Sequence, residues 1–301
     1  MPSYDAAMKD AFGRFSPSGV TGRLIGFAES LPASWLGMRL SFLARNLATR
    51  LLRGGPLDVV RFGARMRLRP YGNTSEKRIA FTPHLFDAAE RAALVEAARE
   101  RPGFVFLDIG ANIGGYALAV AAQAGAQAIV LAVEPQRDIF ERLSFNARLN
   151  GFGNLKLVNC ALTDQNGTVD LFLNQWQSGE ASIRLVSDPD VPVLRVPAMT
   201  LLSLAESEGL TQIDALKISV EGAEEIVLLP FFQEAPKSLW PEIIVIEATA
   251  LTESPALRLA LGMHGYVEDM ATRHHLLLRR TRKGPKPHAA VNVGTMPMAS
   301  D

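Results

Sequence analysis

The pattern of hydrophobic positions changes near residue 104. From there, short continuous apolar runs alternate with segments whose apolar residues recur at helical spacing. Continuous apolar runs are typical of parallel strands that are buried on both faces of a sheet. Seven strands are expected, at about residues 104–107, 129–133, 155–158, 213–219, 242–247, 266–267 and 276–278. The sequence therefore predicts a doubly wound, mostly parallel, Rossmann-like α/β sheet whose last two strands form an antiparallel hairpin at its edge.

The flanking regions have other patterns. Residues 1–55 are expected to form a helical extension, in which large apolar residues recur at helical spacing until Gly54-Gly55-Pro56 stops the helix. Residues 56–101 lead into the main domain, with strand-like alternation at 57–81 and a helical pattern at 85–99. The main domain is expected to cover residues 102–280. Residues 281–301 lack periodicity and are expected to be a disordered tail.

The expected helix within residues 31–53 is basic as well as apolar. Its large apolar residues include Trp35, Leu43 and Leu51, and arginines lie between them, at positions 39, 45, 50 and 53. A basic amphipathic helix can lie on a membrane surface. Packing of its apolar face on the chain's own domain, or on a second copy in a homo-oligomer, is the favoured interpretation.

Composition narrows the class of protein. The 31 Lys and Arg residues balance the 31 Asp and Glu residues, which argues against a dedicated nucleic-acid binder. The single cysteine, Cys160, excludes an internal disulfide and a cysteine-rich zinc site. No segment is apolar enough to span a membrane, and the N-terminus lacks the pattern of a signal peptide. A cytoplasmic location is therefore expected.

A glycine-rich turn follows the first strand of the predicted sheet. It contains Gly110, Asn112 and Gly114, and Asp108 precedes it. Doubly wound sheets bind nucleotides at such a turn, where glycine permits a sharp bend and a close approach of the ligand. Asp108 could attract the ammonium or sulfonium group of S-adenosylmethionine. Glu134, at the end of the next strand, is well placed to accept both ribose hydroxyls of an adenosine moiety.

These residues favour S-adenosylmethionine over a nicotinamide dinucleotide. The turn reads Gly-Ala-Asn-Ile-Gly-Gly, so Asn112 stands where a dinucleotide site has the glycine that admits the pyrophosphate. The carboxylate of Asp108 would also repel a pyrophosphate. A nicotinamide-dependent oxidoreductase remains the less favoured alternative.

Several ordered motifs resemble the FkbM-type methyltransferases, a class I S-adenosylmethionine-dependent family that mostly methylates hydroxyl oxygens. The family's D-x-G-A-N-x-G block is similar to residues 108–114, and its acidic residue followed by proline is similar to Glu134-Pro135. Its Ala-Leu pair is similar to Ala161-Leu162, and its K-I-D-V-E-G-A-E block to residues 217–224. The resemblance, over about residues 76–250, implies a class I fold and a cofactor site that includes Ala161.

One residue departs from the family pattern. Ser219 stands where the family has aspartate, at the end of the fourth strand and beside the expected methyl donor. Serine is a weak base and a poor ligand for a hard divalent cation. Either another group takes the role of the aspartate, or activity has been lost, or the substrate needs no carboxylate there.

The candidates for the chemistry are few. Methyl transfer to an alcohol needs a positioned oxygen and one general base. Glu221 and Glu247, at the ends of neighbouring strands, are the favoured bases, with His84 as the next candidate. Lys217 is assigned either to the chemistry or to an ion pair with Asp214 or another carboxylate. No metal site is expected.

We therefore expect a methyltransferase that acts on a hydroxyl of a small molecule, namely a sugar, a glycolipid or a polyketide-like compound. The alternative is a catalytically degenerate adenosine-binding or scaffold protein of the same fold, which the departure at Ser219 suggests.

Overall fold

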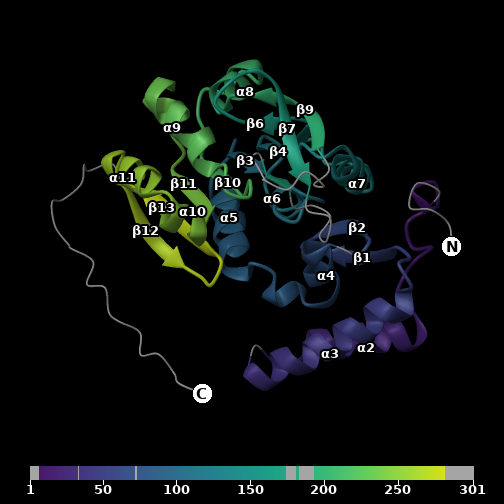
Figure 1. Ribbon diagram of the computed structural model, residues 1–301. Helices are drawn as coiled ribbons and strands as arrows, with labels where there is room; N and C mark the ends of the chain where they lie inside the picture. The colour runs from purple at the N-terminus through teal and green to yellow at the C-terminus, as the bar shows by residue number, and fades with distance from the viewer. Residues whose placement is uncertain (1–6, 33, 72, 174–180, 183–192, 282–301) are drawn as a thin grey trace.

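A seven-stranded sheet forms the centre of the protein. The computed structural model describes residues 7–32, 34–71, 73–173, 181–182 and 193–281 (Figure 1). The strand order is β12-β13-β11-β10-β3-β4-β5, and β13 alone runs antiparallel to the other strands. The strands are β3 (Val105–Ile109), β4 (Ile129–Val133), β5 (Leu155–Val158), β10 (Ala215–Ile218), β11 (Ile243–Glu247), β12 (Tyr266–Ala271) and β13 (His275–Arg280). The predicted sheet and its edge hairpin are confirmed.

Both faces of this sheet are covered, which explains the continuous apolar runs. Along β3, Val105 and Leu107 belong to the hydrophobic core on one face, and Phe106 belongs to the core on the other. The first core includes side chains of α8, α9, α10 and α11, and the second includes side chains of α4, α5, α6 and α7. These helices are α4 (Thr74–Phe81), α5 (Ala88–Glu100), α6 (Ala117–Ala121), α7 (Arg137–Arg148), α8 (Leu201–Ser207), α9 (Glu224–Glu234), α10 (Ala248–Glu253) and α11 (Pro255–Met263). A short 3-10 turn, η2 (Lys237–Leu239), lies between α9 and β11 in the chain.

A second, smaller sheet was not predicted. It lies between β5 and α8 in the chain and has the order β6-β9-β7-β8. Its strands are β6 (Ala161–Leu162), β7 (Gly167–Leu173), β8 (Ala181–Ser182) and β9 (Val193–Met199). Strand β6 is buried throughout, and β9 alternates between exposed and buried positions. Strands of two residues carry too little periodicity to be recognised in a sequence.

The lead-in region corrects one expectation. Residues 57–81 do not alternate as strands throughout: β1 (Leu57–Arg61) and β2 (Ala64–Leu68) form a hairpin, and α4 follows. Asn73 starts this helix, since its side-chain oxygen accepts a hydrogen bond from the backbone N–H of Glu76 at 2.9 Å. An Asn followed three residues later by Glu is a recognisable helix start. The 3-10 turn η1 (Pro83–Leu85) then leads to α5.

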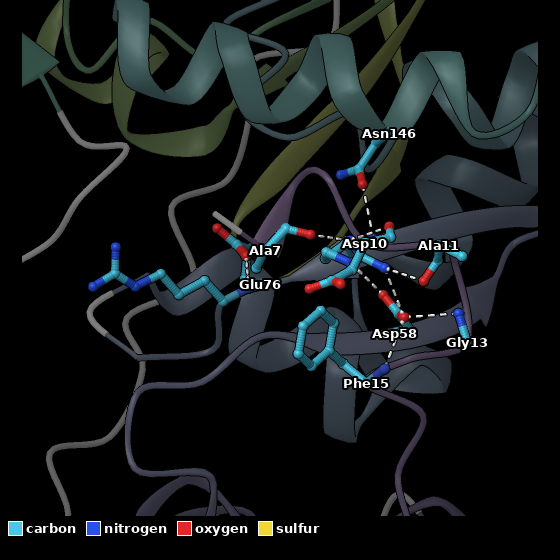
Figure 2. A network of polar contacts seen from close by, with 10 residues as sticks. Ala7, Asp10, Ala11, Gly13, Phe15, Asp58, Glu76 and Asn146 are labelled. Atoms are coloured by element: carbon cyan, nitrogen blue, oxygen red, sulfur yellow. Dashed lines mark hydrogen bonds and ion pairs between the residues drawn. The ribbon is translucent and has the colours of Figure 1, made fainter. Parts of the chain in front are cut away.

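A buried ion pair ties the N-terminal segment to the β1–β2 hairpin (Figure 2). The side chains of Arg67 and Asp58 are fully buried, and Nε of Arg67 lies 2.6 Å from Oδ1 of Asp58. Asp58 also accepts the backbone N–H groups of Gly13 and Phe15. The guanidinium of Arg67 donates to three backbone carbonyls of the N-terminal segment, those of residues 7, 10 and 11. A buried charge needs such partners, and here they hold residues 7–15 against the domain.

The helical extension is a hairpin of α2 (Gly19–Ser30) and α3 (Trp35–Leu52), which lie side by side next to α4 (Figure 1). The apolar stripe of α3 does not pack on the domain: Trp35, Leu43 and Leu47 are exposed. The residues that face the protein are small. Packing of the apolar face on the chain's own domain, the first of the two favoured interpretations, is therefore wrong, whereas packing on a second copy stays a prediction.

Two expectations concern the chain as a whole. Among the described residues, no helix combines the length and apolar character needed to cross a membrane. Of the expected tail, residues 282–301 lie outside the described residues.

Candidate functional site

A cavity of about 410 Å³ lies at the carboxyl ends of four central strands. Its wall includes residues that follow β3, β4, β10 and β11, together with side chains of α4, of β6 and of the turn between β12 and β13. From β3 the chain continues to β4 on one side, whereas β10 flanks β3 on the other. Such a switch point is where open α/β sheets bind ligands. Of the predicted cofactor residues, the cavity wall contains Gly110, Asn112, Glu134, Ala161 and Ser219.

The glycine turn is tightly enclosed by protein. Gly110 has a φ of +72°, and a Cβ built on it would lie 2.0 Å from the carbonyl oxygen of Ser219. The backbone that follows the neighbouring strand β10 therefore requires glycine at position 110, independently of any ligand. Gly114 has a φ of +97°, and a Cβ there would meet Leu118 and Leu143 at 2.9 Å. Asn112 adopts a φ of +51°, a conformation that asparagine tolerates better than most residues.

Glu134 is a buried carboxylate at the cavity wall. Its Oε2 accepts the backbone N–H of Asn112 at 2.9 Å, and its Oε1 accepts that of Gln136 at 3.0 Å. Burial raises the pKa of Glu134 to about 7, although these two hydrogen bonds oppose the shift. A carboxylate fixed by backbone donors can accept hydroxyl groups from a ribose without moving. The geometry therefore fits the predicted ribose contact.

Asp108 has a different place from the one expected. It is fully buried, is not part of the cavity wall, and accepts the backbone N–H of Ala117 at 2.9 Å. Its carboxylate therefore supports the turn from behind instead of facing a ligand. Burial raises the pKa of Asp108, and the nearby ammonium group of Lys217, 3.3 Å away, opposes that rise.

Lys217 holds the glycine turn from the neighbouring strand. Its Nζ donates to the carbonyl oxygens of Gly110 at 2.8 Å and Ile109 at 3.3 Å, in addition to its contact with Asp108. The carboxylate partner is thus Asp108 and not Asp214, which pairs with Arg101. The ammonium group of Lys217 thus contacts three partners on the protein.

The two favoured bases both reach the cavity. Glu247 ends β11 and is half-buried, and the hydroxyl of Ser219 donates to its Oε1. Glu221 follows β10, is exposed, and has a φ of +52°, which is uncommon for a residue other than glycine. Strand β10 pairs with β11 in parallel, so Ser219 and Glu247 meet at the same sheet edge. Ser219, which stands where the family has aspartate, therefore lies against another carboxylate at this edge.

His84 does not belong to the site. It lies in η1, is exposed and is absent from the cavity wall. Ala161 and Cys160 do line the cavity, and burial raises the pKa of the Cys160 thiol to about 11. A thiol with so high a pKa is protonated near neutrality, in agreement with a small buried hydrophobe.

Sequence reasoning missed the opposite wall of the cavity. His274 and His275, in and after the β12–β13 turn, line the cavity together with side chains from the lead-in region. Nδ1 of the buried His275 lies 3.4 Å from Glu90, whose carboxylate also accepts a hydrogen bond from Thr272. Burial opposes ionisation of Glu90, but its contacts with His275 and Thr272 bring its pKa down to about 2. Other side chains on this wall include those of Arg78, Phe86, Asp87, Tyr116 and Arg273.

No sequence signal connects the residues of the lead-in region with those of the β12–β13 turn, because the two segments are about 200 positions apart along the chain. An adjacent histidine pair at the start of a strand was the available clue. In the part of the chain that the structure describes, no group of three or more His, Cys, Asp or Glu side chains could hold a metal ion.

A doubly wound seven-stranded sheet, with a glycine turn after its first strand and a buried acid after its second, defines the class I S-adenosylmethionine-dependent methyltransferases. The family model for the methyltransferase FkbM domain matches residues 108–270, which is more than half of the chain. The chain belongs to this family, and its cofactor is S-adenosylmethionine. The match removes the nicotinamide alternative, whereas the roles of individual residues remain predictions.

Similar folds occur among solved methyltransferases. Precorrin-6Y C5,15-methyltransferase from Geobacter metallireducens is 14% identical, with 65% of this chain and 89% of that chain covered and a TM-score of 0.41. The METTL16 methyltransferase domain is 16% identical, with coverage of 86% and 91% and a TM-score of 0.46. The O-methyltransferase TomG from Streptomyces achromogenes is 12% identical, with coverage of 70% and 88% and a TM-score of 0.41. No curated protein matches the chain significantly.

Proposed function

We propose that this methyltransferase acts on a hydroxyl oxygen of a small acceptor, namely a sugar, a glycolipid or a polyketide-like compound. The observation that carries the proposal is the pairing of Ser219 with Glu247 at the cavity edge where the methyl donor is expected. An alcohol must lose its proton during transfer, and a carboxylate at that edge can take it. S-adenosylmethionine supplies an electrophilic methyl group on a sulfonium, whose sulfur keeps the electron pair of the broken carbon–sulfur bond.

The chain's own residues divide into two sets. On the cofactor side, the backbone around Gly110 and the carboxylate of Glu134 offer acceptors for amine and hydroxyl groups. Lys217 and Asp108 keep that backbone in place. We assign the residues predicted from the sequence to these cofactor-side roles, with Asp108 and Lys217 acting through the turn.

The opposite wall suits a hydroxylated acceptor. It combines the aromatic rings of Phe86 and Tyr116 with the hydrogen-bonding side chains of Arg78, Asp87 and His274. Aromatic faces with polar groups beside them match the alternating apolar and hydroxyl surfaces of a sugar ring. A long nucleic acid would instead require an extended basic surface, and the chain has no net charge to support one.

We assign the general base to Glu247, with Glu221 as the second candidate. Glu247 is half-buried and its orientation is set by the hydroxyl of Ser219, whereas Glu221 is exposed. A half-buried carboxylate with a fixed orientation exchanges protons with a bound alcohol more effectively than an exposed one. We also propose that activity is independent of metal, since Glu247 is the single carboxylate at the end of its strand, and a single carboxylate is a poor site for a hard cation.

Release of S-adenosylhomocysteine in the presence of a panel of sugars, glycolipids and polyketide-like alcohols tests the proposal. Glu247→Gln should lower kcat at least about a hundredfold, in the range of a lost general base, with little change in cofactor affinity. Glu225→Gln, on α9 and outside the cavity wall, is the matched control and should keep full activity. Full activity of both Glu247→Gln and Glu221→Gln would refute the assignment of the base. Loss of turnover in EDTA that magnesium restores would refute metal independence.

A non-catalytic adenosine-binding protein is the second candidate, and Ser219 is the observation that favours it. Cofactor binding without turnover of any acceptor class in the panel would support it. Acceptor-dependent release of S-adenosylhomocysteine would eliminate it.

A further inference from the structure

Helix α3 presents its large apolar side chains to solvent. Trp35 is 65% exposed, Leu36 59% and Leu43 64%, and the row continues through Leu47 and Leu51 along one face of the helix. Phe27 of α2 and Met38 and Phe42 of α3 are exposed as well. Large apolar residues of a helix in a soluble domain normally face the core, and a contiguous exposed group of this kind marks an interaction surface.

The orientation of α3 is fixed by its other face. That face consists of small residues, among them Gly37, Ser41, Ala44 and Ala48, all of which are buried. The hydroxyl of Ser41 donates to the carbonyl of Ala28 on α2 at 3.2 Å. A Cβ on Gly37 would lie 2.2 Å from the carbonyl oxygen of Pro32, so the helix approaches its neighbouring backbone closely. Rotation that buried the large side chains would replace these close contacts with overlaps, and the apolar face therefore stays outward.

The segment that carries this surface has basic but no acidic residues. Residues 30–57 contain four arginines, at positions 39, 45, 50 and 53, and no Asp or Glu. The guanidinium of Arg39 lies 4.4 Å from the ring centroid of Trp35, and that of Arg45 lies 4.8 Å from the ring of Phe42. Arginine stacked on an exposed aromatic ring places a positive charge beside apolar surface, an arrangement that suits the boundary between lipid headgroups and acyl chains.

Charge complementarity selects the partner. A second copy packed through the same face would bring arginine against arginine, with no acidic residue of this segment to compensate. An anionic bilayer meets both needs, because it offers an apolar layer for the leucines and phosphates for the arginines. We propose that α2 and α3 form a peripheral docking element that lies in the surface of an anionic membrane, with the exposed face of α3 inserted at the headgroup boundary.

The docking element is connected to the cavity through one helix. Helix α4 packs against both α2 and α3, and its residues Thr74, Ser75 and Arg78 line the cavity. Docking therefore holds the cavity close to the bilayer, with helix α4 between the docking element and the cavity. This inference does not depend on the acceptor or on the base, since it concerns only the surface of the hairpin.

Flotation of the full chain with vesicles tests the proposal. Vesicles of phosphatidylcholine with 30% phosphatidylglycerol should bind at least tenfold more protein than pure phosphatidylcholine at about 0.1 M salt, and 0.5 M salt should remove most of the difference. Leu43→Glu/Leu47→Glu should lower binding at least tenfold, and Arg39→Gln/Arg50→Gln should abolish the preference for the anionic vesicles.

Leu259→Glu/Met263→Glu is the matched control, because both side chains are exposed on α11, at the other end of the protein (Figure 1). This variant should bind the vesicles as the wild type does. All variants should keep the wild-type circular dichroism and cofactor affinity, since the altered residues are exposed and lie outside the cavity wall.

Three results would overturn the proposal. They are an absence of vesicle binding, equal binding to neutral and anionic vesicles, and equal loss of binding in the control variant. A wild-type dimer in solution that Leu43→Glu/Leu47→Glu dissociates, without vesicle binding, would assign the face to a second copy instead.

Discussion

Replacing Glu134 with alanine separates cofactor binding from folding. The wild-type carboxylate accepts two backbone N–H groups and faces the cavity where the ribose is expected. Hydrogen bonds to a charged acceptor contribute about 1.5–3 kcal/mol, so the affinity for S-adenosylhomocysteine should fall roughly ten- to a hundredfold. Isothermal titration of wild type and variant measures this change directly.

The same substitution should leave the fold intact because two effects oppose each other. Loss of the carboxylate leaves the N–H groups of Asn112 and Gln136 without their acceptor, at about 1–3 kcal/mol each. The substitution also removes a buried charge whose pKa is raised to about 7, and a shift of that size corresponds to about 3 kcal/mol. The free energy of unfolding at pH 7.5 should therefore change by less than about 3 kcal/mol.

The raised pKa of Glu134 also predicts a pH dependence. The folded protein binds the proton more tightly than the unfolded chain does, so the cost of the buried charge is present in full above pH 7 and is relieved as the pH falls toward 4.5. Relative to Glu134→Ala, the wild type should gain unfolding free energy between pH 7 and pH 4.5. Its cofactor affinity should instead weaken below pH 7, because a protonated carboxyl accepts hydroxyl groups less well.

Urea unfolding and titration from pH 5 to pH 8 test both trends. Glu141→Ala is the matched control: it removes an exposed carboxylate on α7, close in the chain to Glu134 but outside the cavity wall. It should change neither affinity nor its pH profile. Unchanged affinity in Glu134→Ala would mean that the ribose is held elsewhere, and a flat difference in stability across this range would refute the raised pKa.

Three further substitutions test the glycine turn and the strand ends. Gly110→Ala should lower the unfolding free energy by at least about 2 kcal/mol more than Gly103→Ala. Both glycines have a positive φ, but only a Cβ at position 110 would clash with Ser219. Equal losses in the two variants would contradict the close contact between Gly110 and Ser219. Lys217→Met should lower the unfolding free energy, measured in urea, by about 3–5 kcal/mol. Adding Asp108→Asn should recover part of that loss, since it removes the buried charge that the first substitution leaves unpaired. No recovery would argue against the ion pair. Ser219→Asp should create a pair of carboxylates with Glu247, so that magnesium raises the melting temperature of the variant and not that of the wild type. No such rise would mean that the two carboxylates do not share a cation.

Local and periodic features of the sequence determined the central architecture. The continuous apolar runs of β3, β4 and β10 are buried on both faces, and such runs are read directly from the chain. The glycine turn and Glu134 were also predictable, because they follow strands and because parallel strands end at one edge. Ser219 and Glu247 were placed at that edge for the same reason, and the structure brings them into contact.

The contacts that the sequence did not indicate join residues that are far apart in the chain. Asp108 was expected to face a ligand, but Lys217 and the N–H of Ala117 enclose it. His275 has no partner that its neighbours in the chain would indicate, yet the edge hairpin brings it to Glu90 and to the cavity. Neither partner could be inferred from spacing along the chain.

Helix α3 shows most clearly what the sequence determined and what the tertiary structure decided. The sequence by itself determined that this segment is a basic amphipathic helix, because periodicity and charge are properties of the segment alone. Only the tertiary structure decided which face meets the protein. The small residues around Gly37 and Ala48 permit a close approach to α2 and α4, whereas the leucines would hold the backbones apart. Packing distance, which no hydrophobic pattern encodes, therefore left the apolar stripe of α3 facing outward.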